Sequence, residues 1–327
     1  MQKHRIVFLV VSVMLLALIA GCSKPEGPSA STGGPTTTAT IAKESKGTVW
    51  MIPSHRAHPV WLVGKAGFEK ACMELGYTPK WEAANNGELD QNVNYMEQAI
   101  TEKAAGIIVF PGNQEAFTPV INKAVEAGIP VVTIHDDAAK SKRKAYIGPN
   151  QQVYAELVAD RIGELLKGKG NVGIMQGSSY PSENRAARFF QERLKAKYPN
   201  IKVIAHDFDT TELVKATEKA TNMIQKYPQL NAVFSTTGGG PVSWSKAMEE
   251  TGKEGKIIVI SMDVTQQNLD LVKSGKIYGI VAQGIYDEGY KGVHILFDKN
   301  AKTINYTDTP IVTKDMVDKF YSQTGGK

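Results

Sequence analysis

Polar or aromatic side chains follow one predicted strand after another along this chain, and hydrogen bonding is the chemistry that their types favour. The clearest case is the segment 131–134, an apolar run rich in β-branched residues that predicts a buried strand. His135, Asp136 and Asp137 follow it at once. The full set is His58, His135, Asp136, Phe208, Thr237, Asp263 and Gln283. Donors, acceptors and flat apolar faces around one cleft predict a binding site for a small polar molecule.

These residue types suit a ligand that has several hydroxyl groups. A carboxylate such as Asp263 can accept two hydrogen bonds. The amide of Gln283 both donates and accepts. An aromatic ring such as that of Phe208 would cover the apolar C–H faces of such a ligand. Such a site rejects analogues that lack a hydroxyl, because a buried partner is then left unpaired.

The elements that must position these residues alternate between strand and helix. Strands are expected at 48–52, 77–83, 106–110, 131–134, 145–147, 171–175, 203–205, 232–235, 257–262 and 278–282. Helices are expected at 60–75, 92–103, 117–127, 151–166, 183–198, 213–226, 241–250, 269–273 and 285–298. This alternation indicates right-handed βαβ units and parallel sheets. Ligands bind such sheets at the carboxyl ends of the strands, where the polar residues lie.

The composition is typical of a two-domain globular protein and gives no indication of nucleic-acid binding. The chain has 327 residues, of which 42% are hydrophobic and 22% are charged, and its formal net charge is +5. This length suits two ordinary domains. Loss of Lys3 and Arg5 with a cleaved leader would lower the charge to +3, too little to indicate nucleic acid as a partner. Cys72 is expected to be a small buried apolar residue in a helix.

The N-terminus is expected to be an export signal followed by a lipid anchor. A basic segment at 3–5 precedes the apolar run 6–20, which has the length of a signal-peptide core and is short for a membrane span. The run ends in Leu18-Ile19-Ala20-Gly21-Cys22, which resembles the lipobox of bacterial lipoproteins. The resemblance implies cleavage before Cys22 and its lipidation, with palmitate as the acyl type. A signal peptide cut nearby, with Cys22 incidental, is the alternative.

Six short motifs, in this order and spacing, resemble the sugar-binding group of the solute-binding proteins of bacterial ABC transporters. They are 129–134 (IPVVTI), 145–148 (AYIG), 207–209 (DFD), 231–234 (NAVF), 259–263 (VISMD) and 281–283 (VAQ). The resemblance covers about residues 47–300 and is greatest to the group that includes ribose-binding protein. It implies the α/β fold of the type I periplasmic binding proteins. Two αβα lobes with parallel-type sheets would be joined by three hinge crossovers, near 148–150, 283–285 and 309–312.

The family's ligand positions map onto this sequence with two departures. His135 lies where the sugar binders usually have an aspartate, and Thr236 to Gly240 replace a common Asn-Asp pair. The arginine position falls on Arg185, with Arg188 as a competing assignment. The expected ligand-binding residues are His58, Trp61, His135, Asp136, Arg185, Phe208, Thr237, Asp263 and Gln283.

The resemblance also implies a domain plan and a set of partners. The expected parts are a lipoprotein signal peptide (1–21), a lipidated Cys22 with a flexible tether rich in Ser, Thr, Gly and Pro (22–46), an N-terminal lobe (47–149 with 284–309) and a C-terminal lobe (150–283 with 310–327). The monomeric protein would close on a monosaccharide or small polyol and deliver it to a membrane permease with its ATPase. A chemoreceptor or sensor kinase is a further possible partner. No enzymatic activity, cofactor, metal or nucleic acid is expected.

Three alternatives stay open at this point. The same fold can bind a furanone of the autoinducer-2 type, a cyclitol or a nucleoside. His55, His58, His135 and Asp136 are the residue types that hold a transition metal, although nothing in the sequence fixes them together. The segment 237–240, between a strand and a helix, has the position of a phosphate-binding loop but lacks the dinucleotide spacing and a Gly-Lys-Ser/Thr motif.

Overall fold

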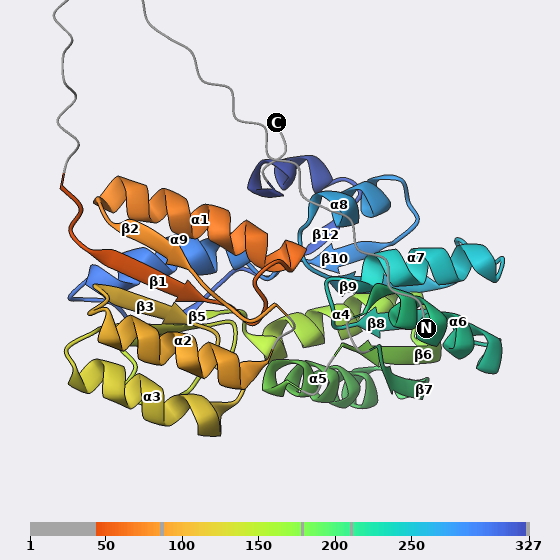
Figure 1. The fold of residues 1–327 in the computed structure, drawn as a ribbon. Coiled ribbons are helices and arrows are strands. Elements are labelled where there is room, and N and C mark those ends of the chain that lie inside the picture. Colours follow the sequence, from red (N-terminus) through yellow and green to blue (C-terminus); the bar gives the residue numbers. More distant parts are fainter. Residues whose placement is uncertain (1–43, 86–87, 178–179, 210–211, 325–327) are drawn as a thin grey trace, which may run out of the picture. The chain divides into compact units, whose positions relative to one another are not determined.

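The computed structural model describes residues 44–85, 88–177, 180–209 and 212–324. The strands form two sheets of six (Figure 1). The first sheet has the order β11-β5-β4-β3-β1-β2 and is parallel throughout. Its strands are β1 (Thr48–Ile52), β2 (Thr78–Trp81), β3 (Gly106–Val109), β4 (Val131–Ile134), β5 (Ala145–Gly148) and β11 (Ile304–Tyr306).

The second sheet has the order β12-β10-β9-β8-β6-β7. Only its edge strand β12 runs antiparallel to the neighbouring strand, β10. The strands are β6 (Lys169–Gln176), β7 (Asn200–Phe208), β8 (Ala232–Ser235), β9 (Ile258–Met262), β10 (Gly279–Val281) and β12 (Ile311–Thr313). The chain passes between the sheets three times, from β5 to α4, from β10 to α9 and from β11 to β12.

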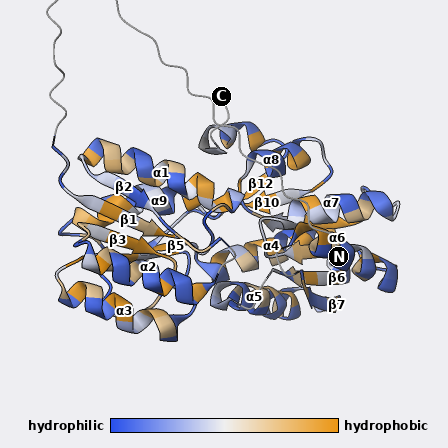
Figure 2. Ribbon diagram, viewed as in Figure 1, coloured by the Kyte–Doolittle hydropathy of each residue, from blue (hydrophilic) through white to orange (hydrophobic). Residues whose placement is uncertain are grey.

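Helices cover both faces of each sheet, so each sheet with its helices forms an αβα lobe. The first lobe has α1 (Pro59–Leu75), α2 (Leu89–Thr101), α3 (Gln114–Glu126) and α9 (Ile285–Phe297). The second has α4 (Gln151–Leu165), α5 (Pro181–Lys197), α6 (Leu213–Lys226), α7 (Gly240–Glu250), α8 (Gln266–Lys273) and the short 3-10 helices η1 (Val317–Lys319) and η2 (Tyr321–Thr324). Hydrophobic residues concentrate on the strands between these helix layers (Figure 2). The predicted fold class is confirmed.

Local sequence explains where the helices that frame the strand ends begin. The side chain of Asn113 accepts hydrogen bonds from the first-turn amides of α3, and Asn150 does the same for α4. His58 caps α1, because its Nδ1 accepts from the amide of Val60 at 3.4 Å and Pro59 occupies the first helical position. These three polar residues follow strands and therefore also cap the helices that come next.

Helices α1 and α9 approach each other closely enough to require glycine at their contact. A Cβ placed on Gly289 would lie 2.1 Å from the main-chain oxygen of Gly64. A Cβ on Gly67 would lie 2.3 Å from the main-chain oxygen of Tyr286. Real Cβ atoms do not come this near to a carbonyl oxygen, so side chains at these positions would separate the two helices.

Two elements differ from the sequence prediction in an informative way. β7 extends over nine residues, whereas only 203–205 were expected. β11, at Ile304–Tyr306, was not expected, because it is a short edge strand whose side chains are largely exposed and its sequence has no apolar run. No helix among the described residues is long and apolar enough to cross a membrane. The predicted signal peptide, Cys22 and most of the tether lie outside those residues.

Candidate functional site

A cavity of about 100 Å³ lies where the carboxyl ends of the strands of both sheets meet. That volume is large enough for several water molecules or a small ligand. The first lobe contributes Ser54, His55, His58, Val60, Trp61, Phe110 and His135. The second lobe contributes Tyr154, Tyr180, Ser182, Glu183, Thr236, Thr237, Gly238 and Asp263, and the crossing segment after β10 contributes Gln283.

One wall of the cavity is a cluster of aromatic rings drawn from both lobes. The ring of Phe110, directly after β3, lies 5.6 Å from Trp61 on α1 and 5.4 Å from Tyr180 of the second lobe. Trp61 is also 5.5 Å from the imidazole of His135, in an edge-on arrangement. These are favourable spacings for aromatic pairs, and the cluster offers apolar surface to a ligand that has C–H faces.

Asp263 and Gln283 form the polar core of the opposite wall. Gln283 Nε2 donates to Asp263 Oδ1 at 2.7 Å, and both residues are nearly fully buried. Burial raises the pKa of Asp263, while the hydrogen bond from Gln283 and the charge of His135 oppose that change. The position of Asp263 Oδ2 requires a glycine at residue 238, because a Cβ on Gly238 would lie 2.6 Å from that oxygen.

Gln283 also links two of the segments that cross between the lobes. Its main-chain oxygen accepts a hydrogen bond from the hydroxyl of Thr307 at 2.7 Å. Thr307 lies in the segment between β11 and β12, whereas Gln283 lies between β10 and α9. The next residue, Gly284, has φ of 76°, and a Cβ there would lie 2.6 Å from that of Thr307. Glycine thus allows the two crossing segments to touch beside the cavity.

His135 is held in a tight turn and paired with a buried carboxylate. The amide of Asp136 donates to the oxygen of Ile134 at 2.7 Å, which closes a three-residue turn around His135 with φ of 64°. Nδ1 of His135 lies 3.2 Å from Oε1 of Glu288, a residue of α9 whose side chain is fully buried. Oε2 of Glu288 has no hydrogen-bond partner among the described residues.

The pairing of His135 with Glu288 sets the charge of both groups. Burial alone would lower the pKa of His135, but the charge and hydrogen bond of Glu288, with smaller effects of Asp263 and Asp136, raise it to about 9. Burial raises the pKa of Glu288 to about 7 against the opposing effect of His135. The two groups titrate as a coupled pair, and His135 stays protonated at neutral pH.

Threonine hydroxyls in the cavity donate away from it, which leaves their oxygens as acceptors. Thr236 Oγ1 donates to Glu183 Oε2 at 2.6 Å, and Thr237 Oγ1 donates to Asp209 Oδ2 at 3.0 Å. Burial lowers the pKa of His58 to about 4, with a smaller effect of the neighbouring His55, so His58 is neutral at pH 7. Because its Nδ1 accepts from the amide of Val60, the proton of the neutral ring lies on Nε2, which is a donor. The threonine oxygens and the carboxylate of Asp263 are acceptors that suit a ligand with several hydroxyl groups.

Six of the nine predicted site residues line this cavity: His58, Trp61, His135, Thr237, Asp263 and Gln283. Asp136 and Arg185 do not line it and instead bond to each other beside it at 2.7 Å. Phe208 lies away from it at the end of β7, 40% exposed, with its ring stacked on His206. Arg188, the competing arginine, is exposed and pairs with Glu192 on the same helix.

Several lining residues escaped the sequence analysis, and some of them had a usable signal. Phe110 follows β3 as the predicted residues follow their strands, so the same rule would have found it. Tyr154, Ser182 and Glu183 lie in helices, and Tyr180 directly precedes α5, so no strand end marks them. Glu288 does not line the cavity but pairs with His135; its only signal was an acidic residue on the otherwise buried side of α9.

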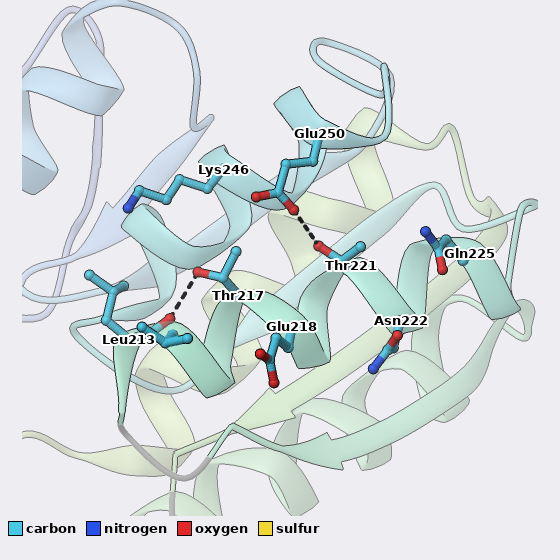
Figure 3. Close-up of a pocket in the computed structure, with 9 residues that line it drawn as sticks. Leu213, Thr217, Glu218, Thr221, Asn222, Gln225, Lys246 and Glu250 are labelled. Atoms are coloured by element: carbon cyan, nitrogen blue, oxygen red, sulfur yellow. Dashed lines mark hydrogen bonds between the residues drawn. The ribbon is translucent and has the colours of Figure 1, made fainter.

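Other features of the surface give less reason to expect a ligand. A larger hollow of about 630 Å³ lies along α6 and α7, with the Thr221 hydroxyl donating to Glu250 at 3.1 Å across it (Figure 3). Leu213 and Val214 at its edge are exposed, and it has no aromatic lining.

Among the described residues, no group of three or more His, Cys, Asp or Glu side chains is placed to hold a metal ion.

Two αβα lobes that enclose a polar and aromatic cavity at their shared strand ends define a two-lobed solute-binding protein. The family comparison agrees with this class, since residues 49–302 match the periplasmic binding protein domain. The chain belongs to the periplasmic binding protein family.

Named relatives of the chain are binding proteins for sugars and polyols. It is 26% identical to the xylitol-binding protein of Mycolicibacterium smegmatis over 78% of this chain and 74% of that protein. It is 24% identical to the ribose import binding protein of Bacillus subtilis, over 84% and 86% of the two chains. The sugar-binding protein of a Bacillus halodurans sugar ABC transporter has a similar structure, with a TM-score of 0.78, 29% identity, and coverage of 84% of this chain and 100% of that one.

Proposed function

We propose that this chain captures a monosaccharide or a related small polyol by closure of its two lobes and delivers it to the permease of an ABC transporter. The observation that supports this most is the cavity itself, which combines an aromatic wall with hydrogen-bond acceptors. Hydroxyl groups satisfy those acceptors, and C–H faces suit the aromatic rings. The protein acts as a binding protein and not as an enzyme, as its named relatives do.

The second part of the proposal is an extracytoplasmic site with a lipid anchor. It is supported by the lipobox-like sequence that ends at Cys22 and by the similarity to the D-allose-binding periplasmic protein of Escherichia coli. Replacement of Cys22 by serine should move the protein from the membrane fraction to the soluble extracellular or periplasmic fraction. Wild-type distribution of that variant would show that Cys22 is not the anchor.

We also propose that the ligand-loaded protein contacts a chemoreceptor or a sensor kinase, and that the chain acts as a monomer.

A ligand screen tests the binding activity directly. Residues 23–327 would be titrated with ribose, allose, xylitol, hexoses, cyclitols, nucleosides and a furanone of the autoinducer-2 type, with the unfolding temperature as readout. Ligand at about a hundred times its Kd adds roughly 2.7 kcal/mol of stability, which is a measurable shift. Calorimetry on each hit, with Asp263→Asn as the control variant, then shows whether the hit occupies this cavity. No response to any sugar or polyol would contradict the proposal.

A further inference from the structure

One buried ion pair joins the two lobes beside the cavity. Asp136 follows β4 of the first sheet, and Arg185 lies on α5, next to the second sheet (Figure 1). Nη2 of Arg185 donates to Oδ1 of Asp136 at 2.7 Å. The carboxylate of Asp136 is fully buried, whereas the side chain of Arg185 is 34% exposed.

The remaining partners of this pair also come from the second lobe or from the boundary between the lobes. Oδ2 of Asp136 accepts from the amide of Ser182, in the first turn of α5, at 3.3 Å. The positive end of that helix favours a carboxylate. Arg185 Nη2 also approaches Oε1 of Gln151 at 3.3 Å, and Gln151 Nε2 donates back to the oxygen of His135 at 3.4 Å. Gln151 begins α4, just after the first crossing segment.

The position of the pair separates it from ligand recognition. Of Asp136, Arg185, Gln151 and Ser182, only Ser182 also lines the cavity. Nη2 of Arg185 donates to both Asp136 and Gln151, and Arg185 does not line the cavity. Both oxygens of Asp136 receive hydrogen bonds from the opposite lobe. A first-lobe carboxylate is thus buried and satisfied only when the lobes are together.

We infer that the Asp136–Arg185 pair holds the lobes closed even when the cavity is empty, and that Arg185 is a positioning residue for capture. This inference rests on the proposed function in that capture requires opening and closing. A pair of this kind stabilises the closed form by an amount that does not depend on which solute is bound. Because apparent affinity scales with the fraction of closed protein, the pair raises affinity for every solute by the same factor.

Small-angle X-ray scattering without any added solute gives the first test. The samples are wild type, Arg185→Met, Asp136→Asn and Arg193→Met. Arg193 is a matched control, because it lies on the same helix and pairs with Asp160 of α4 at 2.7 Å within one lobe. The radius of gyration should increase in Arg185→Met and Asp136→Asn and stay at the wild-type value in Arg193→Met. Equal scattering from all four proteins, or an increase in the control alone, would overturn the inference.

Titrations with D-ribose, D-allose and xylitol separate a positioning role from a direct contact. Loss of the pair should weaken the binding of each solute that the wild type binds by one common factor, on the order of 10- to 100-fold. A factor that differs strongly among the solutes would show that Arg185 contacts them. Failure of all three to bind wild type would count against the proposed function only, since the scattering arm requires no solute.

Discussion

His135 and Asp263 have equivalent positions in the two lobes and the same unusual backbone conformation. His135 is the first residue after β4 and has φ of 64°, and Asp263 is the first residue after β9 and has φ of 73°. Both line the cavity, one from each sheet. Residues other than glycine rarely adopt positive φ, and such strained residues cluster at functional sites.

The strain at Asp263 predicts an unusual order of stabilities. Asp263→Gly should be more stable than Asp263→Ala by about 1 kcal/mol, because only glycine tolerates positive φ without cost. Neither variant should bind the solute, since both lack the carboxylate. Urea unfolding with calorimetry checks both statements. At Thr237, which does not have positive φ, the order should be reversed, and the same order at both sites would contradict the argument.

The coupling of His135 to Glu288 predicts a loss of stability at alkaline pH. The pKa of His135 is raised to about 9 from 6.5, so the folded protein keeps a proton that the unfolded chain releases. That contribution is fully present below pH 6.5 and is lost as the pH rises through 9. Glu288→Gln removes the charge that keeps His135 protonated. The unfolding temperature of wild type should fall more between pH 7 and 9.5 than that of this variant, and parallel curves would refute the coupling.

The lowered pKa of His58 predicts a loss of stability at acid pH, in contrast to the alkaline loss predicted for His135. Its pKa is lowered to about 4 by burial and by His55, so the unfolded chain binds a proton before the folded protein does. Its contribution to stability is complete above pH 6.5 and is lost as the pH falls toward 4. His58→Asn keeps a residue that can cap α1 but removes the titrating group. Thermal unfolding from pH 7 to 4.5 should show a smaller loss for the variant; an equal or larger loss would argue against the prediction.

The contact between α1 and α9 predicts that a single methyl group is harmful at one glycine and harmless at another. Gly289→Ala places a Cβ against the oxygen of Gly64 and should destabilise the protein by about 1–3 kcal/mol. Gly239→Ala is the control, because no atom lies within 4 Å of the added Cβ and φ there is −80°. Urea denaturation should show a clear loss for the first and little change for the second. Equal midpoints would show that the helices can move apart freely.

The sequence predicted the fold and much of the cavity wall because both depend on local patterns. Asp263 and His135 were found by their position directly after apolar strands, which a parallel sheet brings to one edge. Phe208 obeys the same rule, but β7 is the outer strand of its sheet, and the Phe208 side chain is 40% exposed and does not line the cavity. Arg185 has a suitable residue type, yet its partner Asp136 lies on the other lobe, and no local pattern encodes that pairing.

The contact between Gln283 and Thr307 has a consequence for how this protein can change its ligand during evolution. The side-chain amide of Gln283 donates to Asp263 in the cavity wall. Its main-chain oxygen accepts a hydrogen bond from Thr307 in the neighbouring crossing segment. Under the proposed function, a residue that lines the binding cavity thus belongs to the joint about which the lobes would turn. A substitution of Gln283 that altered selectivity would also alter the ease of movement, whereas Trp61 and Thr237 line the cavity outside the crossing segments. New specificities should therefore arise first at the walls and last at the joint.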